Sequence, residues 1–247
     1  MKSKGRAAYI TFPIGLLKGF QMMKFKEVAA MLTNAMNYAL YLNGQRFVDL
    51  VQAADVIGIK FNDIDDAYDS GKELYKFYEG NPLVSINTEI VFDFYENEKS
   101  ESEKLVFAVY CGLRSILGKK KYTKSNNNHL IARSLGFKSF KDLEEKDVPI
   151  YWRYKYFSTP NKIRYHLTEK ILINEISLNW GMKYYSLRNR GFYFGFNISQ
   201  ESLVLNAEVS RKKNRLLELK KGKEEARQKA LKMLASLPTN NRNFTPP

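Results

Sequence analysis

The chain has 247 residues, of which 44% are hydrophobic and 14% aromatic, so it can bury the core of one large domain or of two small ones. Its single cysteine, Cys111, excludes an internal disulfide, suits a reducing cytoplasm and, among apolar neighbours, is predicted to be a small core residue rather than a nucleophile. No apolar stretch approaches the length of a membrane span, so we expect a cytoplasmic protein without membrane contact.

The 40 Lys and Arg residues against 26 Asp and Glu give a net charge of +14, and this charge is unevenly distributed. Residues 1 to 99 hold 11 basic and 13 acidic groups (net −2), residues 100 to 198 hold 18 and 8 (net +10), and residues 199 to 247 hold 11 and 5 (net +6). A polyanionic partner is therefore expected to meet the second half of the chain. A basic surface that serves only solubility is the open alternative.

The N-terminal half is predicted to contain a strand, three helices and a further β element. Residues 9 to 14 form the strand, and apolar positions three or four apart predict helices over residues 23 to 42, 45 to 58 and 63 to 78. β-branched and aromatic residues over 83 to 94 predict a short hairpin or one bent strand. The third helix has a predicted buried face of Ile64, Ala67, Leu74 and Phe77.

The second half begins with a helix and a glycine turn. Ser100 precedes Glu103 by three residues, a capping-box pattern, and an apolar stripe follows. Three basic side chains close this helix and are candidates for contact with nucleic acid: Lys119, Lys120 and Lys121. Ala132 then precedes Gly136 by four residues, which is typical of the first half of a helix-turn-helix, where a small residue permits close crossing and glycine permits the turn.

The same alanine–glycine arrangement occurs in the first half. Ala54 and Gly58 lie 78 residues before Ala132 and Gly136, and the preceding helices show the same offset. We interpret this spacing as a weak internal duplication. Chance could also produce it, because the pattern is common.

The residues after each of these glycine turns are acidic. Residues 62 to 69 carry four aspartates, which would repel phosphates, so the first copy is expected to contact protein rather than DNA. Residues 139 to 147 are also acidic and are not expected to read DNA.

A helix beginning at Pro160 and ending at Gly181 is the better candidate for recognition. Pro160 fits the first helical position and Gly181 a C-terminal stop. Its predicted buried stripe is Ile163, Leu167, Ile171 and Ile176. The candidate nucleic-acid contacts on this helix are Asn161, Lys162, Arg164, Tyr165 and Lys170. An ordinary amphipathic helix with a solvated basic face is the alternative.

A tight antiparallel hairpin is predicted to follow this helix. Its alternating residues form one apolar face: Met182, Tyr184, Phe192, Phe194 and Phe196. The turn runs from Leu187 to Gly191, with Arg188, Asn189 and Arg190 at its tip, where arginines can clamp a nucleic-acid backbone or enter the minor groove. Two exposed arginines on an unrelated hairpin would give the same pattern.

The C-terminal segment is predicted to be one long basic helix that begins after a Ser199 cap and has a flexible end. Its apolar positions lie three or four apart: Leu216, Leu219, Ala226, Ala230, Met233 and Leu237. Arg211, Lys212 and Lys213 are candidate nucleic-acid contacts. The segment could be a dimerising coiled coil, a basic arm ordered on nucleic acid or a solvated helix; we favour the last two combined.

The sequence offers little support for catalysis. With two histidines, His129 and His166, and one cysteine, no zinc site of usual spacing can be written, and no phosphate-binding glycine loop is present. We therefore expect no enzyme activity, no metal and no cofactor. Acidic clusters could hide a metal-dependent nuclease, but solvated acidic faces explain them more simply.

From about Glu103 to Phe196 the chain resembles a winged-helix domain, and with the duplication it resembles the tandem winged-helix replication initiators of plasmids and phages. The resemblance implies a mainly α fold with small β-hairpins (α+β). It implies an acidic winged-helix-like domain over residues 1 to 98, a basic winged-helix domain over residues 99 to 198, and a basic helix and tail over residues 199 to 247. It further implies sequence-specific binding to duplex DNA without catalysis, in initiation or transcription regulation, and a homodimer or protein partner engaged through the N-terminal domain.

Two other functions remain as alternatives. The chain could be a protein-interaction factor, such as a phage-type inhibitor or an assembly component of a nucleoprotein complex. It could also be an RNA-binding module, because its 16 Tyr and 16 Phe residues offer stacking surfaces.

Overall fold

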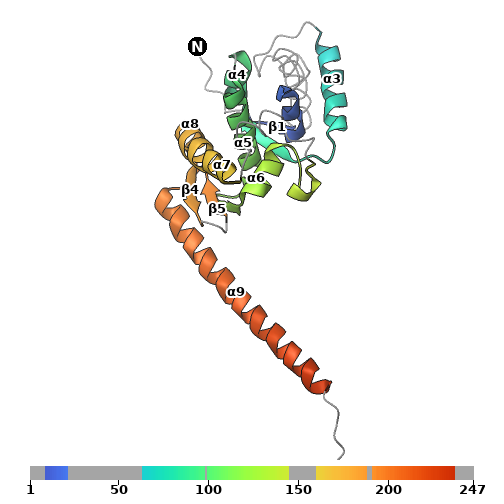
Figure 1. Cartoon of the computed structure of the whole chain (residues 1–247). Helices are drawn as coiled ribbons and strands as arrows, with labels where there is room; N and C mark the ends of the chain where they lie inside the picture. Colours follow the sequence, from blue (N-terminus) through green and yellow to red (C-terminus); the bar gives the residue numbers. More distant parts are fainter. Residues whose placement is uncertain (1–8, 22–62, 98, 145–159, 188–190, 237–247) are drawn as a thin grey trace, which may run out of the picture.

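The computed structural model describes residues 9 to 21, 63 to 97, 99 to 144, 160 to 187 and 191 to 236. These residues form helices and two small antiparallel sheets, so the expected α+β class is confirmed at this level (Figure 1). The helices predicted over 23 to 42 and 45 to 58, with Ala54 and Gly58, lie outside the described residues.

The first sheet joins the N-terminal strand to a strand more than seventy residues later. Strand β1 (Tyr9–Pro13), which was predicted, pairs antiparallel with β2 (Leu83–Asn87). The inward side chains Ile10, Phe12, Val84 and Ile86 are at most 2% exposed. A 3-10 helix, η1 (Ile14–Gln21), continues from β1.

Helix α3 (Ile64–Phe77) confirms the third predicted helix of this half, while the side chains of Ile64 and Ala67 from its predicted buried face lie outside the described residues. The Asp63 carboxylate caps it by accepting hydrogen bonds from the Asp65 and Asp66 N–H groups, each at 3.0 Å. Leu74 is partly buried as expected, but Phe77 is 78% exposed, so its predicted burial is wrong. Tyr75 and Tyr78 pack on the core instead.

The predicted hairpin or bent strand over residues 83 to 94 is also wrong in its second part. Strand β2 ends at Asn87, and helix α4 (Thr88–Glu96) begins directly. The Asn87 side chain accepts a hydrogen bond from the Glu89 N–H at 2.8 Å, which starts the helix in spite of the β-branched residues that follow. The helix then buries Val91 and Phe94.

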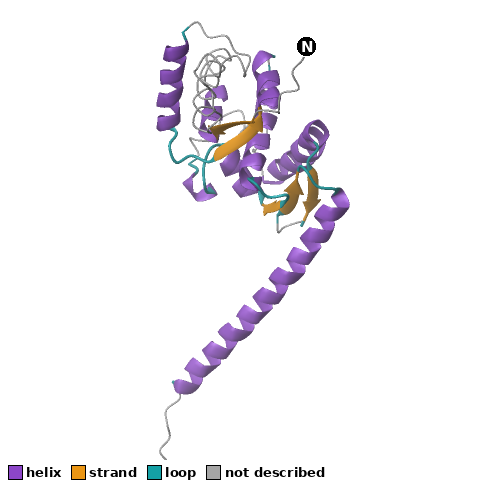
Figure 2. Ribbon diagram, turned by 180° about the vertical axis from the view of Figure 1, so that it is seen from behind, coloured by secondary structure: helices purple, strands orange, loops and turns teal. Residues whose placement is uncertain are grey.

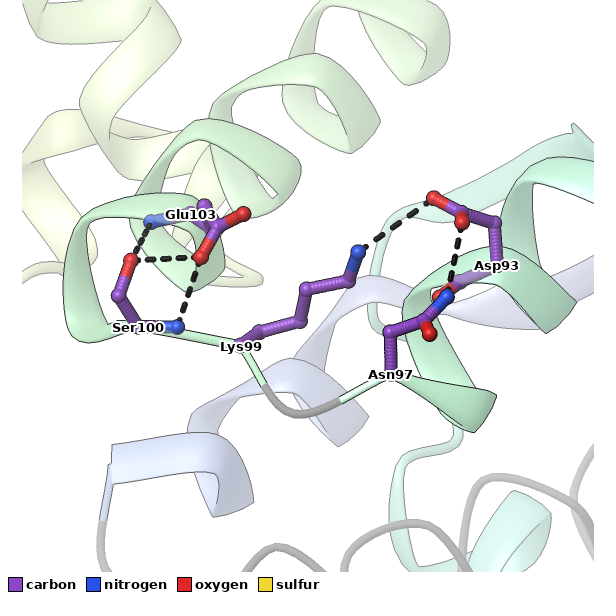
Figure 3. A network of polar contacts seen from close by, with 5 residues as sticks. All are labelled: Asp93, Asn97, Lys99, Ser100 and Glu103. Carbon is purple, nitrogen blue, oxygen red and sulfur yellow. Dashed lines mark hydrogen bonds and ion pairs between the residues drawn. The ribbon is translucent and has the colours of Figure 1, made fainter.

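A local polar network fixes the passage from α4 to α5 (Glu101–Leu117), as Figure 3 shows. The predicted capping box is confirmed: the Glu103 carboxylate accepts from the Ser100 N–H at 2.8 Å, and the Ser100 Oγ accepts from the Glu103 N–H at 3.3 Å. Lys99 forms an ion pair with Asp93 at 3.4 Å, and the Asn97 side chain donates to Asp93 at 3.0 Å.

The second half continues with β3 (Thr123–Ser125), α6 (Asn127–Ser134) and a 3-10 turn, η2 (Phe140–Asp142). One continuous helix follows, made of α7 (Pro160–Tyr165), the π-helical η5 (His166–Ile176) and α8 (Ser177–Trp180); we call it the Pro160 helix. Gly181, in the left-handed conformation, ends it as predicted. Strands β4 (Lys183–Ser186) and β5 (Phe192–Gly195) then complete a sheet of order β3-β5-β4.

The π-helical turns determine which side of the Pro160 helix is buried. Leu167, Ile171 and Ile176 are at most 3% exposed, which confirms these members of the predicted stripe, and Leu172 is buried with them. The step of five residues from Ile171 to Ile176 matches the wider π turn rather than the α turn. Leu178, in the following α-helical turn, is 79% exposed.

The two sides of the second sheet face different neighbours. The predicted apolar face of the hairpin is confirmed, because its five residues all belong to the main core or pack against it. On the other side, Tyr193 packs with Leu203 and Ala207 of helix α9 (Gln200–Ala235), which Ser199 caps as expected. Beyond this contact α9 projects away from the body (Figures 1 and 2), and residues 211 to 236 are all exposed.

The main core is continuous across both halves of the chain. It includes β1 and β2 residues together with α5, α6, the Pro160 helix and β5, and the buried thiol of Cys111 lies within it as predicted. Phe94 of α4 stacks on Phe107 of α5, with ring centroids 4.1 Å apart. Among the described helices, none combines the length and the low charge that a membrane span requires.

Candidate nucleic-acid interface

A groove of about 1280 Å³ lies between the start of α6, the η2 turn, the Pro160 helix and the β4–β5 hairpin. Its lining contains three basic side chains and one acidic side chain, together with amides, hydroxyls and aromatic rings. The charged members are Lys138, Lys141, Arg164 and Glu169. A concave basic surface of this composition suits an extended polyanion better than a small apolar ligand.

The first wall of the groove is the N-terminal turn of α6. Asn126 caps the helix, and its side-chain oxygen accepts a hydrogen bond from the His129 N–H at 2.8 Å. Asn127 and Asn128 also line the groove. The positive end of a helix dipole and side-chain amides are therefore presented to the same space.

His129 anchors this wall through both ring nitrogens. Its Nε2 lies 3.3 Å from a guanidinium nitrogen of Arg133, and its Nδ1 lies 3.4 Å from the Ser125 Oγ. Burial, with a smaller contribution from Arg133, lowers the pKa of the His129 imidazole below its usual value. We therefore assign a neutral ring at neutral pH, which accepts from Arg133 at Nε2 and donates from Nδ1 to Ser125.

The opposite wall is the first part of the Pro160 helix. Arg164, Tyr165, Thr168 and Glu169 face the groove, and Tyr165 is 59% exposed. Tyr184 of β4 lies beside them, where burial raises the pKa of its phenol and hydrogen bonds with Ser186 and Thr168 oppose that shift. The hydrogen bond between Thr168 and Tyr184 thus joins the helix to the hairpin.

The hairpin closes the groove where its two strands meet the turn. The Leu187 N–H donates to the Gly191 carbonyl at 2.8 Å. Gly191 has a φ of +92°, and a Cβ at this position would collide with the Ser125 carbonyl, so the close approach of the hairpin to β3 requires glycine. Arg188, Asn189 and Arg190 lie outside the described residues.

Among the sequence-predicted contacts whose side chains the structure describes, Arg164 and Tyr165 line the groove. Lys162 and Lys170 are exposed elsewhere on the Pro160 helix, and the side chain of Asn161 lies outside the described set. Lys119, Lys120 and Lys121 are exposed at the far end of the sheet, where the Lys121 carbonyl is next to Gly195. Arg211, Lys212 and Lys213 lie on α9, which packs on the other side of that sheet.

The groove also contains residues that the sequence analysis did not predict as nucleic-acid contacts. These are Asn126, Asn127, Asn128, His129, Lys138, Lys141, Thr168, Tyr184 and Ser186. Residues 139 to 147 are acidic on average and are not expected to contact DNA, yet Lys141 lines the groove. The Asp142 carboxylate accepts a local hydrogen bond from the Ser139 N–H at 3.1 Å. A run of three asparagines at a helix start was the signal available for the α6 wall.

The residues described around the groove are suited to binding a ligand. Within the part of the chain that the structure describes, no group of three or more His, Cys, Asp or Glu side chains is placed to hold a metal ion. The one thiol is fully buried, and its pKa lies well above the usual value because of that burial. Compared with protein families, with curated proteins and with solved structures, the chain matches none.

Proposed function

We propose that this chain is a cytoplasmic DNA-binding protein and that duplex DNA occupies the groove between the Pro160 helix and the β4–β5 hairpin. The observation that carries the proposal is the convergence of Lys138, Lys141 and Arg164 with the α6 amides around one open groove. Lysines can pair with phosphates, while arginine and asparagine side chains can also reach base edges.

The order of elements supports a winged-helix assignment for residues 101 to 195. Helix α5, strand β3, helix α6, the Pro160 helix and the β4–β5 hairpin follow one another, and the last strand pairs between the other two. In this assignment the Pro160 helix is the recognition helix and the hairpin is the wing. A role in replication initiation or transcription regulation, as for the initiators that the sequence resembles, is part of the proposal.

The test compares two double variants that remove equal charge. Lys141→Ala with Arg164→Ala removes groove charges, whereas Lys221→Ala with Lys232→Ala removes charges from exposed positions on α9. We expect the groove variant to weaken binding to a selected duplex roughly 10- to 100-fold and to reduce the salt slope by about 2, because each phosphate contact contributes about 1 to that slope. The α9 variant should retain most of the affinity.

The duplex is selected beforehand from a random pool at physiological salt, and folding of both variants is checked by thermal melting. Equal affinity of the groove variant and the parent chain would rule out this groove. Arg188→Ala with Arg190→Ala tests the wing separately. Tighter binding to single strands or structured RNA than to the duplex would favour the RNA-binding alternative.

A further inference from the structure

Helix α9 carries an unpartnered apolar stripe. From residue 211 to residue 236 each side chain is exposed, and the helix packs on the body only through Leu203, Ala207 and neighbouring residues. In proteins, packing of an apolar face supplies most of the stability of a helix. A helix of 36 residues with one short contact at its base therefore has an unused face.

The stripe follows a heptad pattern, and we call it the α9 seam. Its apolar members lie at first and fourth heptad positions: Leu205, Val209, Leu216, Leu219, Ala226, Ala230 and Met233. The larger of these are between 53% and 67% exposed. Lys212 and Lys223 occupy the two remaining positions of the same seam. This repeat is the pattern of a two-stranded coiled coil.

The charged residues that flank the seam are basic with one exception. At the fifth and seventh heptad positions stand Lys213, Arg215, Lys220, Arg227 and Lys229. The single acidic flank, Glu208, is already engaged: it accepts a hydrogen bond from the Tyr185 hydroxyl and pairs with Arg211 at 2.6 Å. The seam therefore combines an apolar stripe with positive edges.

This combination argues against a second copy of the chain as the occupant. In a parallel pair, Arg215 would face Lys220, and Lys223 would face its own equivalent in the core of the pair. An antiparallel pair brings the same basic flanks together. Nucleic acid could match the charge, but it would leave seven apolar side chains without an apolar partner.

We propose that the α9 seam binds an acidic amphipathic helix of another protein as a two-stranded coiled coil. The partner helix would supply aliphatic residues to the apolar layers, and Glu or Asp opposite Lys212 and Lys223 and along both flanks. The α9 contact and the groove lie on different sides of the second sheet, so a partner helix on α9 leaves the groove open.

The probe is a synthetic peptide of four heptads, titrated against the full chain, with Leu opposite the apolar seam residues and Glu opposite Lys212 and Lys223 and at the flanks. Its control peptide has Lys at the same flanks. We expect the acidic peptide to bind at least 10-fold more tightly than the basic one, with its helicity rising on binding. Lys220→Glu with Arg227→Glu in the protein should reduce or reverse this preference. Equal binding of the two peptides would overturn the proposal.

A matched pair of protein variants locates the contact. Leu216→Asp with Leu219→Asp places charge in the seam, whereas Leu217→Asp with Leu231→Asp places it on another face, at leucines that are 55% and 57% exposed. The seam variant should lose at least 100-fold in affinity and the other should lose little. Equal losses would contradict the seam assignment.

Two further measurements test whether a second copy of the chain or nucleic acid binds the α9 seam instead. Sedimentation equilibrium of the chain alone should give a monomer; a dimer that the seam variant dissociates would show that a second copy is the occupant. Duplex DNA should not displace the acidic peptide; competitive displacement would show nucleic acid on α9. The groove variant with Lys141→Ala and Arg164→Ala should bind the peptide normally, which separates failure of this proposal from failure of the DNA-binding one.

Discussion

Gly136 brings together two distant parts of the chain at one backbone contact. Its φ is +84°, and a Cβ built on it would lie 2.7 Å from the Cα of Gly15. Gly15 is itself crowded, since a Cβ there would lie 2.6 Å from a ring carbon of Tyr78. Gly136 is thus required both for the turn after α6 and for the approach of the N-terminal segment.

Comparison with Gly80 separates these two requirements. Gly80 has a φ of +82° and open space around it. Gly80→Ala should cost about 1 kcal/mol of unfolding free energy through backbone strain, and Gly136→Ala roughly 1–3 kcal/mol more through overpacking. Urea denaturation of the two variants measures the difference. Equal costs would mean that the Gly15 contact contributes nothing to stability.

At the residue scale, local chemistry was predictable from the sequence and long-range neighbours were not. The turn at Gly136 and the cap at Ser100 each follow from residues within a few positions of one another. The residues near Gly136 in the sequence do not predict that Gly15 is its neighbour in the fold. The same holds for Gly112 in α5, where a Cβ would lie 2.5 Å from the Ser134 Oγ. The expected small residue of the helix crossing, Ala132, is buried, but Gly112 provides this close contact.

At the element scale, the capping box of α5 predicts a specific loss of stability. Ser100→Ala should cost about 1 kcal/mol, because it removes the side-chain acceptor for the Glu103 N–H. Ser102→Ala, an exposed serine two residues later, should cost much less and is the matched control. Thermal melting at neutral pH compares them. A cost as large for Ser102 would argue against the cap.

The cap also has a pH dependence with a defined sign. Hydrogen bonds from Ser100 lower the pKa of the Glu103 carboxyl below its ordinary value of 4.5. The carboxylate therefore contributes stability above that value, and the contribution is lost as the pH falls through the lowered pKa. The Ser100→Ala variant should show a smaller loss between neutral and acidic pH than the parent chain.

Elements with strong local signals were predicted, and elements decided by tertiary pairing were not. The Pro160 helix has a proline start and a glycine end, and its hairpin alternates apolar and polar residues. By contrast, β2 pairs with β1 rather than with residues 88 to 94, because Asn87 starts a helix there. The groove is harder still, since its walls come from four separate segments and its lysines lie in a sequence that is acidic on average.

At the scale of the whole molecule, the continuous core predicts that the two halves unfold together. Ile86 of β2 is fully buried and belongs to the same core as the Pro160 helix. Ile86→Ala should cost about 2–5 kcal/mol and should lower the midpoint reported by Trp180, which stacks on Tyr110 at 4.2 Å. Leu83→Ala, at an exposed position of the same strand, is the control.

Trp152→Phe provides a background in which Trp180 is the single tryptophan. Coincident transitions by circular dichroism and by Trp180 fluorescence are expected in this background. If Ile86→Ala leaves the midpoint of the Trp180 transition unchanged, residues 99 to 198 fold independently of the β1–β2 pair. That result would agree with the division into domains that the sequence predicts.

The projecting helix α9 also affects the hydrodynamics of the molecule. At 1.5 Å per residue its 36 residues extend about 54 Å, whereas a compact chain of 247 residues has a radius of gyration of only about 18 Å. Such a rod increases friction far more than it increases mass. A monomer of 28.7 kDa would then elute from a sizing column ahead of compact proteins of equal mass. Stoichiometry with DNA or with a helical partner should therefore be read from sedimentation equilibrium or light scattering, whose signals follow mass rather than shape.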